Sequence, residues 1–473
     1  MMLQTDIAVI GAGPAGANAA LAAARQGFSV MLLDEQPLPG GQVWRAKSTA
    51  ILDAPATPEG DAGDRLRQSV KRSSVTYAGD ARVWQIEPVE GAWQLHMLKG
   101  GRTAPLRARA LVIATGAREF VQPVPGWTTP GVLGLAGATA LFKQELALPG
   151  KRIIVSGTGP LVFYVAAEIR RLGGEVAAVV TPNSQGDWLR VLPAMLPRPD
   201  LLMRGARWIA DLMASGVPIH WRHAVTRVEG GSRVRGVGFR KLAPDWSPIG
   251  TSQGLEGDSL CLGNGLIPAV EAAQLAGVAL AYHPELGGWV PRHDEDGATD
   301  VPGVFICGDS AGIRGAAAAE IHGRLAGLCA AQHLGADTRK ERKQLRPIHA
   351  RAARFGTTMT ALSIPRAGLA QLTTEETVIC RCESLTRSAI AAEIAGGARS
   401  SNAVKSGLRA GMGACGGKFC QTTVARMIAA ADGRAEADVP PPTPRPPLRP
   451  VPVSVLAGDF EYSDLPIPKP APL

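Results

Sequence analysis

The sequence predicts an α/β protein with two Rossmann-like nucleotide-binding domains, a small helical domain that contains four cysteines, and an extended proline-rich tail. Three observations predict this fold class. Apolar strands at residues 7–10 and 152–155 each lead into a glycine-rich turn and a helix, the unit from which parallel, doubly wound sheets are built. Two close pairs of cysteines follow near the C-terminus. From residue 439 onward the chain is rich in proline, so this stretch cannot form a compact core.

The first glycine turn has the pattern Gly11-x-Gly13-x-x-Gly16, between the strand at 7–10 and an alanine-rich helix at 15–27. The first glycine permits a tight turn, the second lets the backbone approach a pyrophosphate, and the third lets helix and strand pack closely. The helix N-terminus also favours the phosphate charge. The residues that we expect at this nucleotide are Gly11, Gly13, Pro14, Ala15 and Gly16.

A second strand, at residues 29–33, ends in two acidic residues. Asp34 comes 18 residues after Gly16, at the place where an acidic side chain binds the ribose hydroxyls of adenosine. We therefore expect Asp34 at the ribose, with Glu35 as a neighbour that shares this role.

A second nucleotide-binding unit begins at residues 152–155 and continues through Gly157 and Gly159. Its third glycine is replaced by Val162, and its next strand, at 175–180, ends without the acidic residue expected for NAD or an arginine for a 2′-phosphate. Three interpretations remain open: an NAD(P)H site, a site for a non-redox nucleotide such as ATP or ADP, and a fold element without a ligand. Gly157 and Gly159 are the candidate binding residues.

The cysteine pairs have the spacing Cys380-x-Cys382, 32 intervening residues, and Cys415-x4-Cys420. Two pairs of thiolates on separate loops suit a [2Fe–2S] cluster, and the glycines around the second pair let backbone N–H groups approach its sulfides. A structural zinc site and ordinary buried thiols are the alternatives. Three nearby cations could offset the negative charge of a cluster: Lys405, Arg409 and Lys418. The other cysteines stand singly in apolar segments and are left out of the site: Cys261, Cys307 and Cys329.

Two resemblances follow from these residues. Segments 378–383 and 411–420 resemble the bacterioferritin-associated-ferredoxin-like [2Fe–2S] domain, over roughly residues 375–435. Segments 40–44, 111–117 and 304–309 resemble disulfide-reductase-like flavoproteins, which implies FAD. By that resemblance the further FAD-binding residues are Gly41, Gln42, Ala114, Thr115, Gly116, Gly308 and Asp309, with Asp309 at the ribityl chain.

Taken together, the chain resembles the alpha (B) subunits of heteromeric opine oxidases, hydroxyproline and proline dehydrogenases, and hydrogen cyanide synthase. The resemblance implies an electron-transfer subunit that pairs with an amino-acid-oxidase-like FAD beta subunit, and it allows a flavin shared between subunits and a small ferredoxin-like subunit. A self-sufficient NAD(P)H-dependent oxidoreductase and a non-enzymatic iron–sulfur scaffold are the alternatives. The sequence assigns no catalytic residue. No cysteine pair occurs in residues 1–260, so thiol–disulfide chemistry is not expected.

These anchors predict the domain organisation. An acidic Pro/Gly stretch at 53–64 is expected to be a loop, and residues 336–374 a basic helical connector. The tail is expected either to be disordered or to lie as an arm over a partner. The predicted domains are a split FAD-binding domain at 1–120 and 295–335, an inserted second nucleotide-binding domain at 145–290, the connector at 336–374, the [2Fe–2S] domain at 375–435 and the tail at 436–473.

Composition narrows the class further. The formal net charge is +9, yet the basic residues are scattered rather than clustered with aromatics, so nucleic-acid binding is not expected. Seven cysteines in 473 residues do not make a disulfide framework, which indicates a reducing, cytoplasmic compartment. The apolar run at residues 131–142 is too short to span a bilayer, which leaves only peripheral contact with a membrane open.

Overall fold

The computed structural model describes residues 2–51, 53 and 55–457. Its first sheet runs in the order β3-β2-β1-β6-β5-β4, and β19 pairs in parallel with the end of β6. The strands around β1 are parallel, whereas β4, β5 and the start of β6 form an antiparallel meander. The strands are β1 (Leu3–Ile10), β2 (Val30–Leu33), β3 (Thr76–Ala78), β4 (Arg82–Val89), β5 (Ala92–Lys99), β6 (Arg102–Ile113) and β19 (Val304–Ile306).

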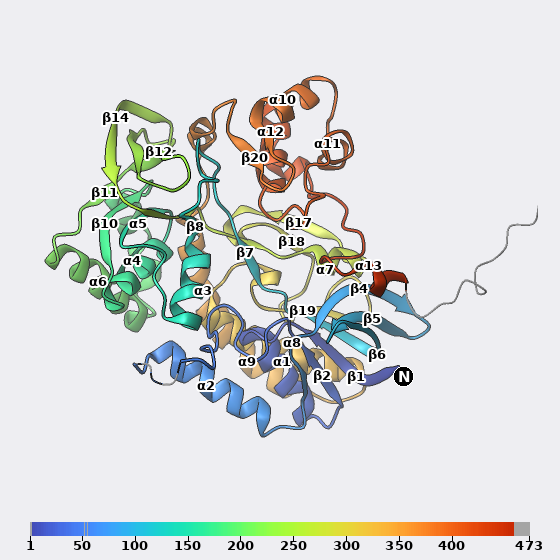
Figure 1. The fold of residues 1–473 in the computed structure, drawn as a ribbon. Helices are drawn as coiled ribbons and strands as arrows, with labels where there is room; N and C mark the ends of the chain where they lie inside the picture. Colours follow the sequence, from blue (N-terminus) through green and yellow to red (C-terminus); the bar gives the residue numbers. More distant parts are fainter. Residues whose placement is uncertain (1, 52, 54, 458–473) are drawn as a thin grey trace, which may run out of the picture.

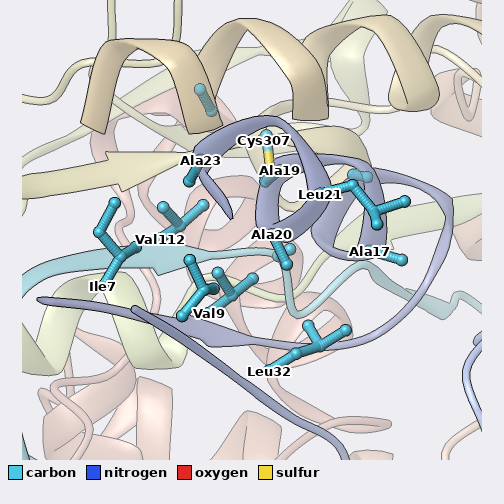
Figure 2. Close-up of a cluster of buried hydrophobic side chains, with 14 of the residues drawn as sticks. Ile7, Val9, Ala17, Ala19, Ala20, Leu21, Ala23, Leu32, Val112 and Cys307 are labelled. Atoms are coloured by element: carbon cyan, nitrogen blue, oxygen red, sulfur yellow. The ribbon is translucent and has the colours of Figure 1, made fainter. Parts of the chain in front are cut away.

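One face of this sheet is covered by α1 (Pro14–Arg25), beyond which lies α8 (Ala316–His333). Figure 2 shows the small side chains of α1 lying against Ile7, Leu32 and Val112 of the strands. Full burial of a Val, Leu or Ile side chain, such as those of the strands, contributes roughly 1.5–3 kcal/mol. The alanine-rich surface of α1 lets α8 approach to backbone contact: a Cβ on Gly323 would lie 2.0 Å from the carbonyl oxygen of Ala15.

The predicted loop at 53–64 is wrong, because most of it belongs to α2 (Pro58–Lys71). Thr57 caps this helix by accepting a hydrogen bond from the Gly60 N–H, and Pro58 occupies the first turn, where its missing N–H costs nothing. Glu59 and Asp61 stand in the same turn and favour the helix dipole. The cap, the proline and the acidic residues are all typical of a helix N-terminus, but the proline and glycine content of this stretch had favoured a loop.

A second sheet, in the order β11-β10-β9-β15-β8, is parallel throughout. A separate antiparallel sheet, β12-β13-β14, accompanies it. The strands are β8 (Val132–Gly134), β9 (Arg152–Gly157), β10 (Glu175–Thr181), β11 (Ile219–Trp221), β12 (His223–Glu229), β13 (Gly236–Leu242), β14 (Pro248–Glu256) and β15 (Ser259–Gly263). The helices are α3 (Leu135–Glu145), α4 (Leu161–Arg171), α5 (Gln185–Met195) and α6 (Pro199–Ala214).

Two antiparallel strands connect the sheets, β7 (Ala117–Glu119) and β16 (Leu266–Pro268). After them come α7 (Glu271–Leu275) and the hairpin of β17 (Leu280–His283) and β18 (Gly288–Pro291). The sheet memberships support a split first domain with an insertion, and the predicted domain boundaries stay a prediction.

The C-terminal part lies above this hairpin in Figure 1, in orange and red. The long α9 (Arg339–Ala361) leads to this C-terminal part. Two cation–π contacts join the C-terminal part to the segment that follows β7: Arg426 stacks on Phe120 at 4.6 Å and Arg381 on Trp127 at 5.2 Å. Its elements are β20 (Val378–Cys380), β21 (Leu385–Thr386), α10 (Arg387–Ala395), α11 (Ser401–Leu408) and α12 (Gln421–Asp432).

The described part of the proline-rich tail lies on this chain's own first sheet. The Leu448 N–H donates to the carbonyl of Trp84 at 2.8 Å, and Arg82 donates to the carbonyl of Pro450 at 2.9 Å. We call residues 440–457, which end in α13 (Val453–Ala457), the C-terminal arm. The rest of the predicted tail, 458–473, lies outside the described residues. Within the part of the chain that the structure describes, no helix is long and apolar enough to cross a membrane.

Candidate functional site

The glycine turn after β1 is built as the nucleotide motif requires. Gly11 has φ +101°, and a Cβ on it would lie 2.2 Å from the carbonyl oxygen of Ala114. A Cβ on Gly16 would lie 1.8 Å from the Gly11 oxygen, so only glycine allows α1 to approach the turn. Gly13, by contrast, has nothing closer than 3.9 Å, which leaves room beside its backbone. The turn therefore forms a cradle that a phosphate group can enter.

The two acidic residues after β2 differ in their contacts. The Asp34 carboxylate accepts the Ala12 N–H at 2.5 Å and the Gln36 N–H at 2.7 Å, which fixes it beside the glycine turn. Burial raises the pKa of Asp34 above its ordinary value, against those two hydrogen bonds. Glu35 instead forms an ion pair with Arg449 of the C-terminal arm. The structure thus holds Asp34 beside the glycine turn and Glu35 against the arm, and the binding of a ribose by Asp34, with Glu35 sharing this role, stays a prediction.

Segments far apart in the sequence meet at this turn. The Gly40 N–H donates to the Ala12 carbonyl at 2.8 Å, and a Cβ on Gly41 would lie 2.8 Å from the Cα of Gly13. A Cβ on Gly308 would lie 2.6 Å from the Cβ of Ala15. The remaining predicted residues of these segments lie in the same region or beside it: Gln42 in the turn that follows Gly41, and Ala114, Thr115 and Gly116 at the end of β6.

Asp309 stands just before the N-terminus of α8, as the sequence predicts. Its carboxylate accepts the Arg314 and Gly315 N–H groups at 3.3 Å each, and burial raises its pKa. The N-cap residue of α8, Gly315, has no side chain, and no described side chain accepts a hydrogen bond from the N–H groups of the first turn that follows it, so these stay available to an electron-rich ligand.

A cavity of about 130 Å³ lies between the linker strands, the β17–β18 hairpin and the start of α12. The Gln421 side chain is buried and its Oε1 has no hydrogen-bond partner. Gly287, at one wall, approaches Ile313, which follows Asp309 by four residues. The cavity therefore lies between the linker strands and the cysteine-bearing domain, and its lining begins at Arg118, one residue after the flavin-type segment 111–117. Sequence patterns did not indicate these polar residues of its lining, because they come from separate segments and share no motif: Arg118, Asn264, Tyr282, Gln421 and Arg426.

The four predicted cysteines form two neighbouring pairs, Cys380 with Cys420 and Cys382 with Cys415. Among residues 2–51, 53 and 55–457, no three His, Cys, Asp or Glu side chains gather round one point so as to hold a metal ion. A [2Fe–2S] cluster takes its four thiolates as two per iron, so a paired donor set suits it. Cys380 and Cys420 are buried, whereas Cys382 is exposed.

Hydrogen bonds and close backbone approach around these thiols favour the thiolate form that a cluster requires. A hydrogen bond from Cys420, together with N–H groups that include that of Gly411, lowers the pKa of Cys380 to about 5 against the effect of burial. The same pairing raises the pKa of Cys420, as expected when two thiols share one charge. A Cβ on Gly413 would lie 2.1 Å from the Cβ of Cys382, so glycine is required where the two loops meet. The residues fit a thiolate-bound cluster.

The glycine turn after β9 is filled by contacts from the protein itself, unlike the turn after β1. A Cβ on Gly157 would lie 1.7 Å from the Gly263 carbonyl oxygen, so this glycine serves close packing. The Gly159 N–H donates to Asn183 at 3.0 Å, and Asn183 in turn donates to the Leu362 carbonyl at 2.8 Å. Asn183 thus links the Gly159 turn to Leu362, which directly follows α9 within the connector. A nucleotide at Gly157 and Gly159 stays a prediction.

Comparison with known proteins gives the class. The family model for pyridine nucleotide-disulphide oxidoreductases matches residues 5–324, and the model for the BFD-like [2Fe–2S] binding domain matches residues 378–430. The chain is therefore an FAD-dependent oxidoreductase with a [2Fe–2S] cluster, and the zinc alternative falls away.

Individual relatives narrow this class. The chain is 32% identical to one of the subunits of opine oxidase from Rhizobium meliloti over 466 residues, covering 96% of this chain and 87% of the relative. It is 31% identical to hydrogen cyanide synthase subunit HcnB of Pseudomonas aeruginosa, covering 95% of this chain and 97% of the relative. The chain belongs to the family that contains these subunits. Its fold is similar to that of L-proline dehydrogenase from P. horikoshii, with a TM-score of 0.73 and 20% identity, covering 96% of this chain and 80% of that one.

Proposed function

We propose that the chain is the electron-transfer subunit of a heteromeric dehydrogenase or oxidase that acts on an amino acid of the opine, proline or hydroxyproline type. The observation that carries this proposal is that a single chain contains both the glycine cradle after β1 and two neighbouring pairs of thiols, with a cavity lined by Arg118 and Gln421, which adjoin a flavin-type segment and Cys420 in sequence. The relatives named above are subunits of larger enzymes, which supports a hetero-oligomer. The partner that we propose is an amino-acid-oxidase-like FAD subunit that contains the substrate pocket.

FAD accepts two electrons and the cluster carries one at a time, so a chain that holds both can pass electron pairs on singly. The residues of this chain supply position and charge. In this proposal Asp34 would hold the ribose and Asp309 the ribityl chain of FAD, and the N-terminus of α8 would stabilise negative charge on the flavin ring. We propose these FAD-binding residues: Gly11, Gly13, Pro14, Ala15, Gly16, Asp34, Gly41, Gln42, Ala114, Thr115, Gly116, Gly308 and Asp309. The proposed cluster ligands are Cys380, Cys382, Cys415 and Cys420.

An anaerobic visible-spectrum titration of the purified chain tests the proposal. We expect flavin and cluster to absorb together, to stay oxidised with NADH, NADPH or proline, and to bleach with dithionite. Adding the amino-acid-oxidase-like partner with its substrate should then bleach both. Rapid bleaching by NADH or NADPH alone would show a self-sufficient reductase and overturn the proposal.

The flavin placement has its own test. Asp309→Ala removes the carboxylate at the α8 N-terminus and should abolish or strongly reduce FAD content. The control is Asp300→Ala, an exposed aspartate in the same part of the chain. Equal FAD content in both variants would show that the flavin lies elsewhere.

A further inference from the structure

The C-terminal arm is fastened at its start to the cysteine-bearing domain. Val439, the residue before the arm, is buried in the apolar core that also contains Cys380 and Cys420. Asn402 of α11 donates to the Thr443 hydroxyl and accepts the Thr443 N–H, both at 3.1 Å. The arm therefore leaves the core around the proposed cluster ligands from a fixed position.

Further along, the arm is fastened to the first sheet, next to the acidic loop after β2. Leu448 packs on the core of this sheet, and its N–H donates to the Trp84 carbonyl at 2.8 Å. The next residue, Arg449, donates from two guanidinium nitrogens to the two carboxylate oxygens of Glu35. Such a contact fixes the orientation of the two side chains as well as their distance. Two adjacent residues of the arm thus engage the first domain by a backbone hydrogen bond, apolar packing and an ion pair.

The loop that the arm contacts is the one that positions Asp34. Asp34 and Glu35 are consecutive, and their carboxylates make different contacts: that of Asp34 accepts the Ala12 N–H of the glycine turn, and that of Glu35 binds Arg449. The Asp34 carbonyl accepts the Ala81 N–H at 2.9 Å. The arm is therefore attached both to the residue that follows Asp34 and to β4, which begins directly after the backbone partner of Asp34.

The proline content of the arm favours this attachment. Proline occupies seven of the eleven positions 440–450. A proline-rich chain is already extended before it docks, so it loses little conformational entropy on docking. The side chains of Arg449 and Glu35 are 39% and 35% exposed, so their ion pair contributes only modestly to stability. A modest contribution is enough to hold a segment that loses so little entropy.

We propose that the C-terminal arm is a strap that retains FAD, with Arg449 as a positioning residue that holds the Asp34 loop at the adenosine end of the site. This inference rests on the function proposed above, including the assignment of Asp34 to the ribose. A loop that is already fixed loses less entropy when the nucleotide binds, so binding is stronger. The effect is reciprocal by thermodynamic linkage: bound FAD holds the arm to the same extent as the arm holds FAD.

The first test measures the release of FAD from the full-length holoprotein, followed by the rise of flavin fluorescence after dilution. Arg449→Gln should release FAD roughly threefold faster, the effect expected of one partly exposed ion pair. Leu448→Pro removes the N–H that binds the Trp84 carbonyl without changing the Arg449 side chain, and it should also release FAD faster. The control is Arg445→Gln, at an exposed arginine of the same arm, which should leave the rate unchanged.

A double variant tests whether Arg449 acts through Glu35. If it does, Glu35→Gln combined with Arg449→Gln releases FAD no faster than Arg449→Gln alone. Additive effects of the two single changes would show that the two residues hold the nucleotide independently, and would overturn the positioning role of Arg449.

Hydrogen exchange of the full chain tests the reciprocal effect. The Leu448 amide should exchange more slowly with FAD bound than in the FAD-free chain, whereas an arm with a merely structural role would exchange equally in both. Equal exchange, or wild-type release rates in both Arg449→Gln and Leu448→Pro, would overturn the inference. A wild-type chain that binds no FAD would refute the proposed function itself, whereas a chain that binds FAD with unchanged release in the variants refutes only the strap.

Discussion

The connector helix α9 is fastened to the first domain by one buried carboxylate, and its removal gives the sharpest stability prediction. Asp296 is fully buried and accepts hydrogen bonds from Arg346 at 2.9 and 2.7 Å and from Arg342. The Arg342 side chain is only 9% exposed, whereas that of Arg346 is 39% exposed. Asp296→Asn removes the charge with almost no change in volume.

The magnitude follows from these exposures. Removing one partner of a buried ion pair costs about 3–5 kcal/mol, because the other charge stays buried without compensation. Arg346 can turn to water while Arg342 cannot, so we expect the lower end, about 3 kcal/mol. For a cooperative unit of roughly 150–250 residues this corresponds to a melting temperature lower by roughly 6–12 °C.

The assay is thermal unfolding of the holoprotein, with Asp337→Asn as the control. Asp337 pairs with Arg339 at 3.0 Å at the start of the same helix, but both side chains are largely exposed, so no measurable change is expected. The two arginines hold the pKa of Asp296 below its ordinary value against the effect of burial. The stabilisation is thus complete at neutral pH and is lost as pH falls through that lowered pKa, so the difference between wild type and Asp296→Asn should shrink in acid. Equal melting temperatures for the two variants at neutral pH would refute the reasoning.

Further predictions concern the glycines and a buried acid. Gly16→Ala places a Cβ 1.8 Å from the Gly11 oxygen and should abolish FAD binding, read from flavin absorbance; retention of FAD would contradict the cradle geometry. Gly205→Ala on α6, with nothing within 4 Å, should instead raise the free energy of unfolding by about 0.5–1 kcal/mol in a urea titration. Burial raises the pKa of Glu119 to about 8, so the folded chain binds this proton more tightly than the unfolded chain, and stability falls as pH rises toward 8. Glu119→Gln should flatten that part of the melting-temperature profile; an unchanged slope would show that Glu119 is ionised.

Local patterns predicted much of the flavin-type site. The turn from Gly11 to Gly16 and the acid at Asp34 are close in sequence, so strand, turn and helix geometry fix their relation to each other. The same reasoning failed for residues 53–64, where proline and glycine indicated a loop. There Thr57 and Pro58 start a helix that gains its stability from Leu66 and Val70 packed on the core. Helix stability of this kind comes from tertiary burial, which composition does not reveal.

The ion pair between Arg118 and Glu271 was beyond sequence reasoning for a related cause. The two residues come from separate segments and follow no spacing rule, so nothing in the chain order indicates that they meet. The C-terminal arm is similar: its proline content correctly indicated an extended chain, yet its docking on β4 depends on backbone groups of Trp84 and Pro450 that any sequence would supply.

Short-range patterns were enough to establish the class of the protein, because nucleotide turns and cysteine pairs are imposed by the shapes of a pyrophosphate and a two-iron cluster. How these parts face each other was settled by folding alone. Folding paired Cys380 with Cys420, placed Asn183 on the Gly159 turn, and paired Arg118 with Glu271. Such contacts join residues far apart in the chain, and they form only when burial of the cores brings distant surfaces together.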